Sequence, residues 1–237
     1  FDRPGTTRDS IYIPYERQGQ HYTLIDTAGV RRRARIKEAV EKYSVIKTLQ
    51  AMDHADVVIV VLNAQESIND QDLRVLSKVI EMGKPFVLAF NKWDGMDEDE
   101  RKQFKDKIDQ RLPFVSYARR YFISALHGSG VGKLYHAVSE AHSGATKDYT
   151  TGQLTKILTA ALKEHQPPIV KGRRIRLRYA HIGGRHPLLI VIQGKQTDSL
   201  QKTYQRFLSN YYRKALQLIG VPLLLRLKTD ENPFRNE

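Results

Sequence analysis

Two short polar motifs follow apolar runs that have the composition of buried strands. Residues 91–94 (Asn-Lys-Trp-Asp) follow the run 86–90, and residues 26–29 (Asp-Thr-Ala-Gly) follow the run 21–25. The carboxyl ends of parallel strands are where doubly wound sheets bind ligands. We therefore expect the two motifs to contribute to one ligand site.

Asp94 is the candidate that reads a base. A carboxylate in the plane of guanine accepts hydrogen bonds from both the ring N–H and the exocyclic amine, and adenine offers neither donor there. Each charge-assisted hydrogen bond contributes about 1.5–3 kcal/mol, so two of them favour guanine by about two to four orders of magnitude. Asn91 is expected to bridge neighbouring loops and approach the base, and the aliphatic stem of Lys92 to lie over its ring. The alternative is an ordinary polar turn between a strand and a helix.

The motif at residues 26–29 has the groups for a phosphate and a metal. Asp26 could hold Mg²⁺ through water, and the amide of Gly29 could contact a terminal phosphate. Thr27 and Ala28 complete the same loop and are counted as candidate binding residues. Taken alone, this pattern is also an ordinary strand-ending turn.

Residues 4–9 (Pro-Gly-Thr-Thr-Arg-Asp) precede the first expected strand, at the distance of a mobile loop that closes over Mg²⁺ with a threonine hydroxyl. Thr7 is the preferred ligand and Thr6 the alternative. Thr7 and Gly29 are therefore the candidate catalytic residues.

Ser124, Ala125 and Leu126 follow a further short strand, where a backbone amide could meet the carbonyl oxygen of guanine. The glycine-rich residues 128–133 are not expected to form a phosphate loop. A histidine stands where the first glycine of such a loop belongs, and a leucine where its Ser or Thr belongs. We interpret this segment as a loop leading into the last helix of the domain.

Apolar periodicity predicts the elements that position these motifs. Strands and helices alternate, which indicates an α/β fold with a doubly wound, mostly parallel sheet of the P-loop-NTPase type. The expected strands are 11–15, 21–25, 57–62, 86–90 and 121–124, and the expected helices are centred on 40–49, 73–80 and 104–108, with a last one starting at 134.

A polar stretch then separates this domain from a second one. We expect a first domain over 1–143, a linker over 144–152 and a small α+β module over 153–237. The module has the order helix, strand, strand, helix, strand, with a glycine turn at 183–184 between its first two strands. Its expected elements are 154–163, 173–179, 188–192, 200–219 and 223–228.

Composition limits the classes of partner. The formal net charge is +13, which favours polyanions such as RNA, although solvated charge without a specific partner is the alternative. There are no cysteines, so disulfides and thiolate metal sites are excluded. The longest apolar runs are far shorter than the roughly 20 residues that cross a bilayer. A soluble, cytoplasmic protein without a membrane partner is expected.

One strand of the second domain is strongly basic. Its cationic residues alternate with Ile175 and Leu177, which would place them on the solvent face of the strand. The alternatives are RNA binding, a solvated edge that discourages aggregation, and docking of the module on the first domain. The aromatic residues of 200–219 have helical spacing and are expected in the core. The basic residues are Lys171, Arg173, Arg174, Arg176 and Arg178.

The motifs, in this order, resemble those of Era-like GTPases, with residues 6–9 and 26–29 as the two switch motifs and 91–94 and 124–126 as the base motifs. The resemblance extends over the whole chain to the Der (EngA) family. Residues 41–50 and 70–73 resemble that family's second GTPase domain, and 165–168, 179–181 and 231–234 resemble its KH-like domain.

The resemblance implies GTP and GDP as ligands, Mg²⁺ as cofactor, and K⁺ beside the phosphates in some relatives. It also implies a role in maturation of the large ribosomal subunit, with its precursor and rRNA as partners. The family's phosphate-binding loop is expected to precede Phe1. Val30 stands where other GTPases carry a catalytic glutamine, so water positioning is expected to come from elsewhere.

Two functions follow as hypotheses. The first is a GTP-hydrolysing switch whose guanine selectivity depends on Asp94. The second is a module that binds RNA or a ribosomal surface without turnover, in a salt-sensitive manner and independently of GTP.

Overall fold

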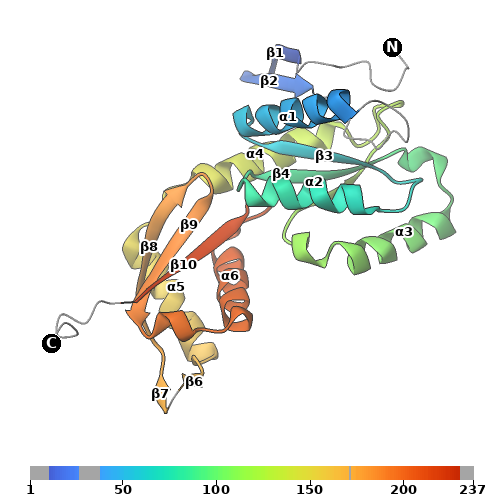
Figure 1. Ribbon diagram of the computed structural model, residues 1–237. Helices are drawn as coiled ribbons and strands as arrows, with labels where there is room; N and C mark the ends of the chain where they lie inside the picture. Colours follow the sequence, from blue (N-terminus) through green and yellow to red (C-terminus); the bar gives the residue numbers. More distant parts are fainter. Residues whose placement is uncertain (1–10, 27–37, 171, 230–237) are drawn as a thin grey trace.

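The computed structural model describes residues 11–26, 38–170 and 172–229, with side chains left undescribed for 38–45 and Arg173. Two bodies follow each other along the chain (Figure 1). The first contains β1 (Ile11–Arg17), β2 (Gln20–Asp26), α1 (Glu38–His54), β3 (Val58–Asn63), α2 (Asp70–Glu81), β4 (Phe86–Asn91), α3 (Glu98–Arg111), β5 (Arg120–Phe122) and α4 (Gly132–Thr146). The second contains α5 (Thr151–Glu164), β6 (Ile169–Val170), β7 (Arg173–Arg174), β8 (Arg176–Arg185), β9 (Leu188–Lys195), α6 (Lys202–Leu216) and β10 (Leu223–Thr229).

The centre of the first body is a parallel sheet with strand order β3-β4-β5. Alternate residues of β4 enter two different cores. Phe86, Leu88 and Phe90 pack with α2 and α3, whereas Val87 and Ala89 pack with α4. Because both faces are covered, all of these residues are buried, as the uninterrupted apolar run predicts.

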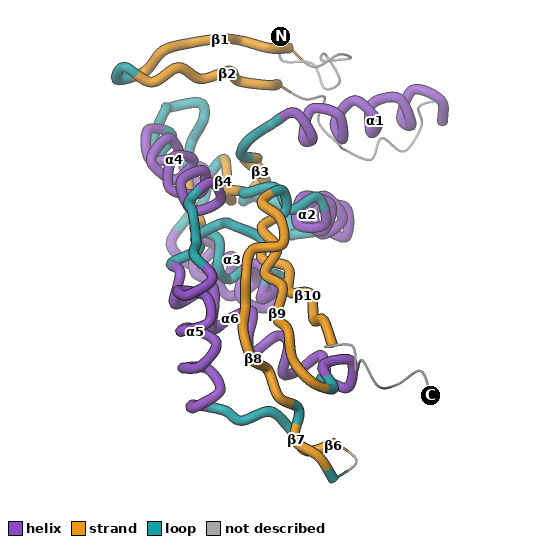
Figure 2. Tube along the Cα trace, turned by 90° about the vertical axis from the view of Figure 1, so that its left-hand side faces the viewer, coloured by secondary structure: helices purple, strands orange, loops and turns teal. Residues whose placement is uncertain are grey.

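β1 and β2 form a separate antiparallel hairpin, which lies beyond α4 and α1 (Figure 2). Gln18 and Gly19 both have positive φ, at 51° and 74°, which is the backbone of a two-residue hairpin turn. We expected the strand that leads to Asp26 to be parallel to its neighbours, and this is wrong for the described residues. Within the described residues, β2 pairs only with β1. The pair is antiparallel because a two-residue turn joins the two strands.

Three tyrosines hold the hairpin against α4. Tyr15 and Tyr22 stack with ring centroids 5.3 Å apart, and Tyr135 of α4 meets both edge-on. The guanidinium carbon of Arg17 lies 4.1 Å from the centroid of the Tyr135 ring. The contact therefore attaches the strand that ends in Asp26 to the helix that follows residues 128–131.

The second body is a three-stranded sheet of order β10-β9-β8 with α5 and α6 on one face. β9 pairs in parallel with β10 and antiparallel with β8. Ile175 and Leu177 are buried while Arg174, Arg176 and Arg178 are exposed, so the predicted alternation of faces is confirmed for these residues. The single strand expected over 173–179 is wrong, because β7 pairs with β6 in a separate two-stranded sheet and β8 begins only at Arg176. The aromatic helix packs into the core as expected, and the hydroxyl of its buried Tyr212 donates to the carbonyl of Leu154 at 2.9 Å.

The glycine turn expected at Gly183 and Gly184 is wrong. Both glycines lie inside β8, next to a shift in its register with β9, and the chain turns at the cis peptide bond before Pro187. A Cβ atom at Gly183 would lie 2.4 Å from a methyl carbon of Val191. A residue without a side chain is needed here because the two strands approach closely, and not because the chain reverses.

Backbone hydrogen bonds join the two bodies at Gly220. Its N–H donates to the carbonyl of Tyr117 at 3.0 Å, and its carbonyl accepts from the N–H of Phe86, the first residue of β4, at 2.7 Å. Beside them, the guanidinium carbon of Arg213 lies 4.2 Å from the Tyr117 ring centroid. Within the described ranges, no helix is long and apolar enough to cross a membrane.

Candidate functional site

The loops that follow β4 and β5 are held side by side by backbone hydrogen bonds. Ile123 donates to the carbonyl of Phe90 at 2.9 Å, and Trp93 donates to the carbonyl of Ile123 at 3.1 Å. The two base motifs expected from the sequence, 91–94 and 124–126, therefore lie next to each other at one edge of the sheet.

Asn91 links the two loops through its side chain. Its Oδ1 accepts a hydrogen bond from the N–H of Ala125 at 2.8 Å. Its own backbone carbonyl accepts from the N–H of Ala64, after β3, at 2.9 Å. One residue thus ties together the loops after three neighbouring strands, which fixes the platform on which a planar ligand could lie.

The backbone at Lys92 and the turn after it set the position of Asp94. Lys92 has a left-handed backbone with φ 65°, and a short 3-10 turn over Trp93–Gly95 follows it. Trp93 points toward the protein, with its ring centroid 4.2 Å from that of Phe122. The Asp94 side chain keeps 37% of its surface exposed. It is therefore accessible to a ligand.

The surroundings of Asp94 favour its charged form. A hydrogen bond with the Ser124 side chain is the largest influence that lowers the pKa of the Asp94 carboxyl, followed by a hydrogen bond with its own backbone. The charges of His127 and Arg101 lower this pKa further, while burial opposes them. A carboxylate that stays ionised is an acceptor for two hydrogen bonds in one plane.

The loop after β5 has a defined shape. Ser124 donates through its N–H to the carbonyl of Ser129 at 2.9 Å, and its Oγ accepts from the N–H of His127 at 3.2 Å. Gly130 has φ +76°, and a Cβ there would approach the Phe122 carbonyl oxygen to 2.8 Å. Leu126 is 85% exposed at the tip. α4 begins directly afterwards, as expected for a loop that leads into a helix.

His127 is a site residue that we did not expect from the sequence. Its Nε2 lies 3.5 Å from Oδ2 of Asp94. The available signal was its position three residues after Ser124, where a serine hydroxyl commonly accepts from a backbone N–H. That spacing alone does not show that the imidazole turns toward Asp94.

Asp26 is exposed at the end of β2. The rest of its motif, Thr27, Ala28 and Gly29, lies outside the described residues, as do Thr6 and Thr7. Mg²⁺ often binds to one or two carboxylates together with phosphate oxygens and water. A single exposed carboxylate fits that pattern, and the described residues contain no cluster of three metal-binding side chains.

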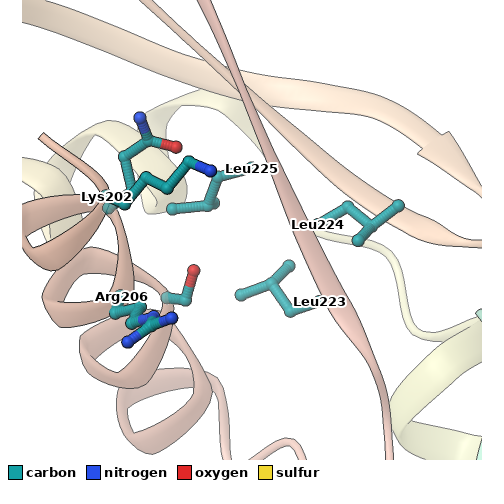
Figure 3. Close-up of a pocket in the computed structure, with 7 residues that line it drawn as sticks. Lys202, Arg206, Leu223, Leu224 and Leu225 are labelled. Atoms are coloured by element: carbon teal, nitrogen blue, oxygen red, sulfur yellow. The ribbon is translucent and has the colours of Figure 1, made fainter. Parts of the chain in front are cut away.

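Of two hollows, one reaches the loops beside Asn91 and Asp94, and the other lies in the second body. One, of about 320 Å³, lies between residues 64–67 and α3 and reaches Gly95. The other, of about 290 Å³, lies between α6 and β10, where Lys202 and Arg206 face Leu223 and Leu225 across the gap (Figure 3). The α6–β10 hollow has a partly cationic lining.

Comparisons with known proteins cover both bodies. A family model described as "50S ribosome-binding GTPase" matches residues 1–92, and one described as "KH-domain-like of EngA bacterial GTPase enzymes, C-terminal" matches residues 149–228. Together with the observed order of elements, they confirm the predicted fold class.

Curated relatives match over the entire chain. GTPase Der of Coxiella burnetii (strain Dugway 5J108-111) is 57% identical over 237 residues, which is 100% of this chain and 54% of the relative. GTPase Der of Aliivibrio fischeri (strain MJ11) is 56% identical over 236 residues, or 100% of this chain and 47% of the relative. The chain thus spans about half the length of the curated relatives it matches.

A solved structure of Era, in complex with MgGDPNP and a segment of 16S ribosomal RNA, shares 16% identity and a TM-score of 0.49, over 97% of this chain and 83% of that chain.

Proposed function

Because the chain belongs to the GTPase Der (EngA) family, we propose that it binds GTP and GDP and takes part in GTP hydrolysis as a switch in the biogenesis of the large ribosomal subunit. The observation that supports this most directly is the platform formed by Asn91, Asp94 and the 124–126 loop. It combines an exposed, ionised carboxylate with backbone amides at the carboxyl ends of parallel strands.

At this platform, Asp94 reads guanine through the ring N–H and the exocyclic amine. Asn91 positions the loop after β5, because its Oδ1 already accepts from Ala125. The amides around Ala125 and Leu126 lie beside the base carbonyl, and the stem of Lys92 covers one face of the ring. Each of these groups belongs to a loop held by backbone hydrogen bonds, so the platform needs little reordering when the base binds.

At the phosphate end, Asp26 and Thr7 are the proposed residues for Mg²⁺, and Gly29 is the proposed contact to the terminal phosphate. When bound, Mg²⁺ would neutralise charge on the phosphate oxygens. Thr27 and Ala28 complete this loop. The resemblance adds K⁺ as a second cation, for which we assign no ligand.

The proposed partners are the large-subunit precursor and its rRNA, which implies a cytoplasmic location. The KH-like domain would change its position with the state of the nucleotide site, through its contacts at Gly220. These contacts include the first residue of β4, the strand that ends in Asn91. We also propose the division into a GTPase domain over 1–143, a linker over 144–152 and a KH-like domain over 153–237.

The test is a titration of this chain with fluorescent GDP and GTP in magnesium buffer. Asp94→Asn should weaken guanine binding by about 10²–10⁴-fold and gain affinity for xanthosine nucleotides, whose base presents an acceptor in place of the amine donor. Asp99→Asn, which removes an exposed carboxylate on α3, is the matched control and should bind like the original chain. Equal guanine affinity in the two variants would contradict the proposed base site.

The second candidate is a binding module that contacts RNA or a ribosomal surface without turnover. The exposed arginines of β8 and the α6–β10 hollow with Lys202 and Arg206 favour it. Such binding should weaken steeply as salt rises and should not change on addition of GTP. RNA binding of that kind by a chain that binds no guanine nucleotide would favour this candidate over the first.

A further inference from the structure

A histidine imidazole faces the carboxylate that is proposed to read the base. His127 Nε2 lies 3.5 Å from Oδ2 of Asp94, and 60% of the imidazole surface is exposed. The backbone N–H of His127 is held by Ser124 Oγ at 3.2 Å, and the Ser124 side chain also bonds to Asp94. The loop therefore fixes the start of the His127 side chain beside Asp94.

We propose that His127 is a specificity-determining residue of the base site, whose protonated imidazole competes with the base for the Asp94 carboxylate. This inference rests on the proposed function, because it requires that Asp94 accept hydrogen bonds from guanine.

The imidazole and the base compete because both use the oxygens of the Asp94 carboxylate, and different bases need different numbers of these oxygens. Guanine presents two donors to the carboxylate, so it requires both oxygens, including the Oδ2 that His127 approaches. Hypoxanthine lacks the exocyclic amine and presents one donor, so it can use the other oxygen. A protonated His127 should therefore weaken binding of a guanine nucleotide more than binding of a hypoxanthine nucleotide.

The other charged group that acts on Asp94 comes from α3. Arg101 donates through Nη2 to the carbonyl of Trp93 at 3.1 Å and lies over the Trp93 ring, with its guanidinium carbon 5.5 Å from the centroid. An arginine keeps its charge at every pH at which the protein is folded. Asp94 is already held in its ionised form by its hydrogen bonds. The terminal phosphates of GDP and IDP also gain a proton near about pH 6 and change the affinity of both nucleotides alike. Only a pH dependence that differs between the two nucleotides is therefore assigned to His127.

The experiment measures the affinities of this chain for GDP and IDP, each with Mg²⁺, from about pH 8 down to about pH 5.5. An exposed ion pair changes a binding constant modestly, so GDP affinity should fall by about two- to fivefold over this range, and IDP affinity by less. In His127→Ala, the GDP and IDP profiles should become parallel. His142→Ala, which removes an exposed histidine of α4, should retain the original difference.

Outcomes for the two proposals differ. If Asp94→Asn loses guanine selectivity but His127→Ala keeps the original GDP and IDP profiles, the role of His127 is overturned and the base site stands. If Asp94→Asn retains guanine selectivity, the base site is overturned and the inference with it. If His127→Ala lowers GDP affinity at all pH values, His127 is a supporting contact of the base and not a competitor.

Discussion

Replacing Gly220 with alanine should weaken the contact between the two bodies and lower the free energy of unfolding. Gly220 has φ +67°, and a Cβ added there would lie 2.3 Å from the carbonyl oxygen of Phe86. The left-handed backbone costs alanine about 1–2 kcal/mol. The clash must also displace two backbone hydrogen bonds, to Tyr117 and Phe86, which contribute about 0.5–1.5 kcal/mol each. We expect a loss of about 2–5 kcal/mol in the free energy of unfolding.

The measurement is urea unfolding followed by the fluorescence of Trp93, the single tryptophan. Far-ultraviolet circular dichroism would be recorded in parallel, because a variant with a weakened contact between bodies can unfold in two steps. Gly128→Ala is the matched control. Gly128 has φ +70° with nothing within 4 Å of an added Cβ, so this variant carries the backbone strain alone, about 1–2 kcal/mol. Equal losses in the two variants would refute the argument that Gly220 is required for close approach.

The remaining predictions concern the half-buried Tyr117, whose hydroxyl is buried, and the fully buried Tyr212. Burial raises the pKa of Tyr117 to about 12, and its hydroxyl has no hydrogen-bond partner, so Tyr117→Phe should leave stability at pH 7 unchanged or increased. Because the folded-state pKa of Tyr117 lies above the ordinary value of 10.0, the native state keeps the proton to a higher pH than the unfolded state does. The native state therefore loses stability as pH rises from about 10 to 12. Urea unfolding in that range should show a smaller loss of stability for Tyr117→Phe than for the original chain. Tyr212→Phe should instead cost about 0.5–1.5 kcal/mol in thermal or urea unfolding, because it removes the 2.9 Å hydrogen bond to the carbonyl of Leu154. A stability loss in Tyr117→Phe as large as that in Tyr212→Phe would contradict both assignments.

Much of the fold of the first domain can be predicted from the pattern of apolar residues in the sequence. The run 86–90 is apolar at every position, which predicts a strand covered on both faces, and β4 enters two cores as that requires. The parallel order of β4 and β5 could be inferred from the helix between them. Since parallel strands end at the same edge, the meeting of Asn91 with Ala125 could also be predicted.

Two of the wrong predictions, the glycine turn and the parallel pairing of β2, concern positions where the spacing of residues in the sequence does not show how closely two segments approach. Gly183 and Gly184 match a turn as well as they match a strand that bulges against its neighbour. The choice depends on Val191, eight residues after Gly183, whose side chain occupies the space of a Cβ. Likewise, Asp26 is predicted at a strand end, but its pairing depends on the backbone of Gln18 and Gly19.

By itself, the sequence determined the order of elements and the faces they bury, because these depend on residue type and local period. It also supplied the residue types on which the proposed base site rests. Only the tertiary structure decided that His127 turns toward Asp94 and that Gly220 joins the two bodies. Both contacts depend on loop backbone angles and on segments brought together by packing. Such distances are products of the whole fold, and no local pattern encodes them.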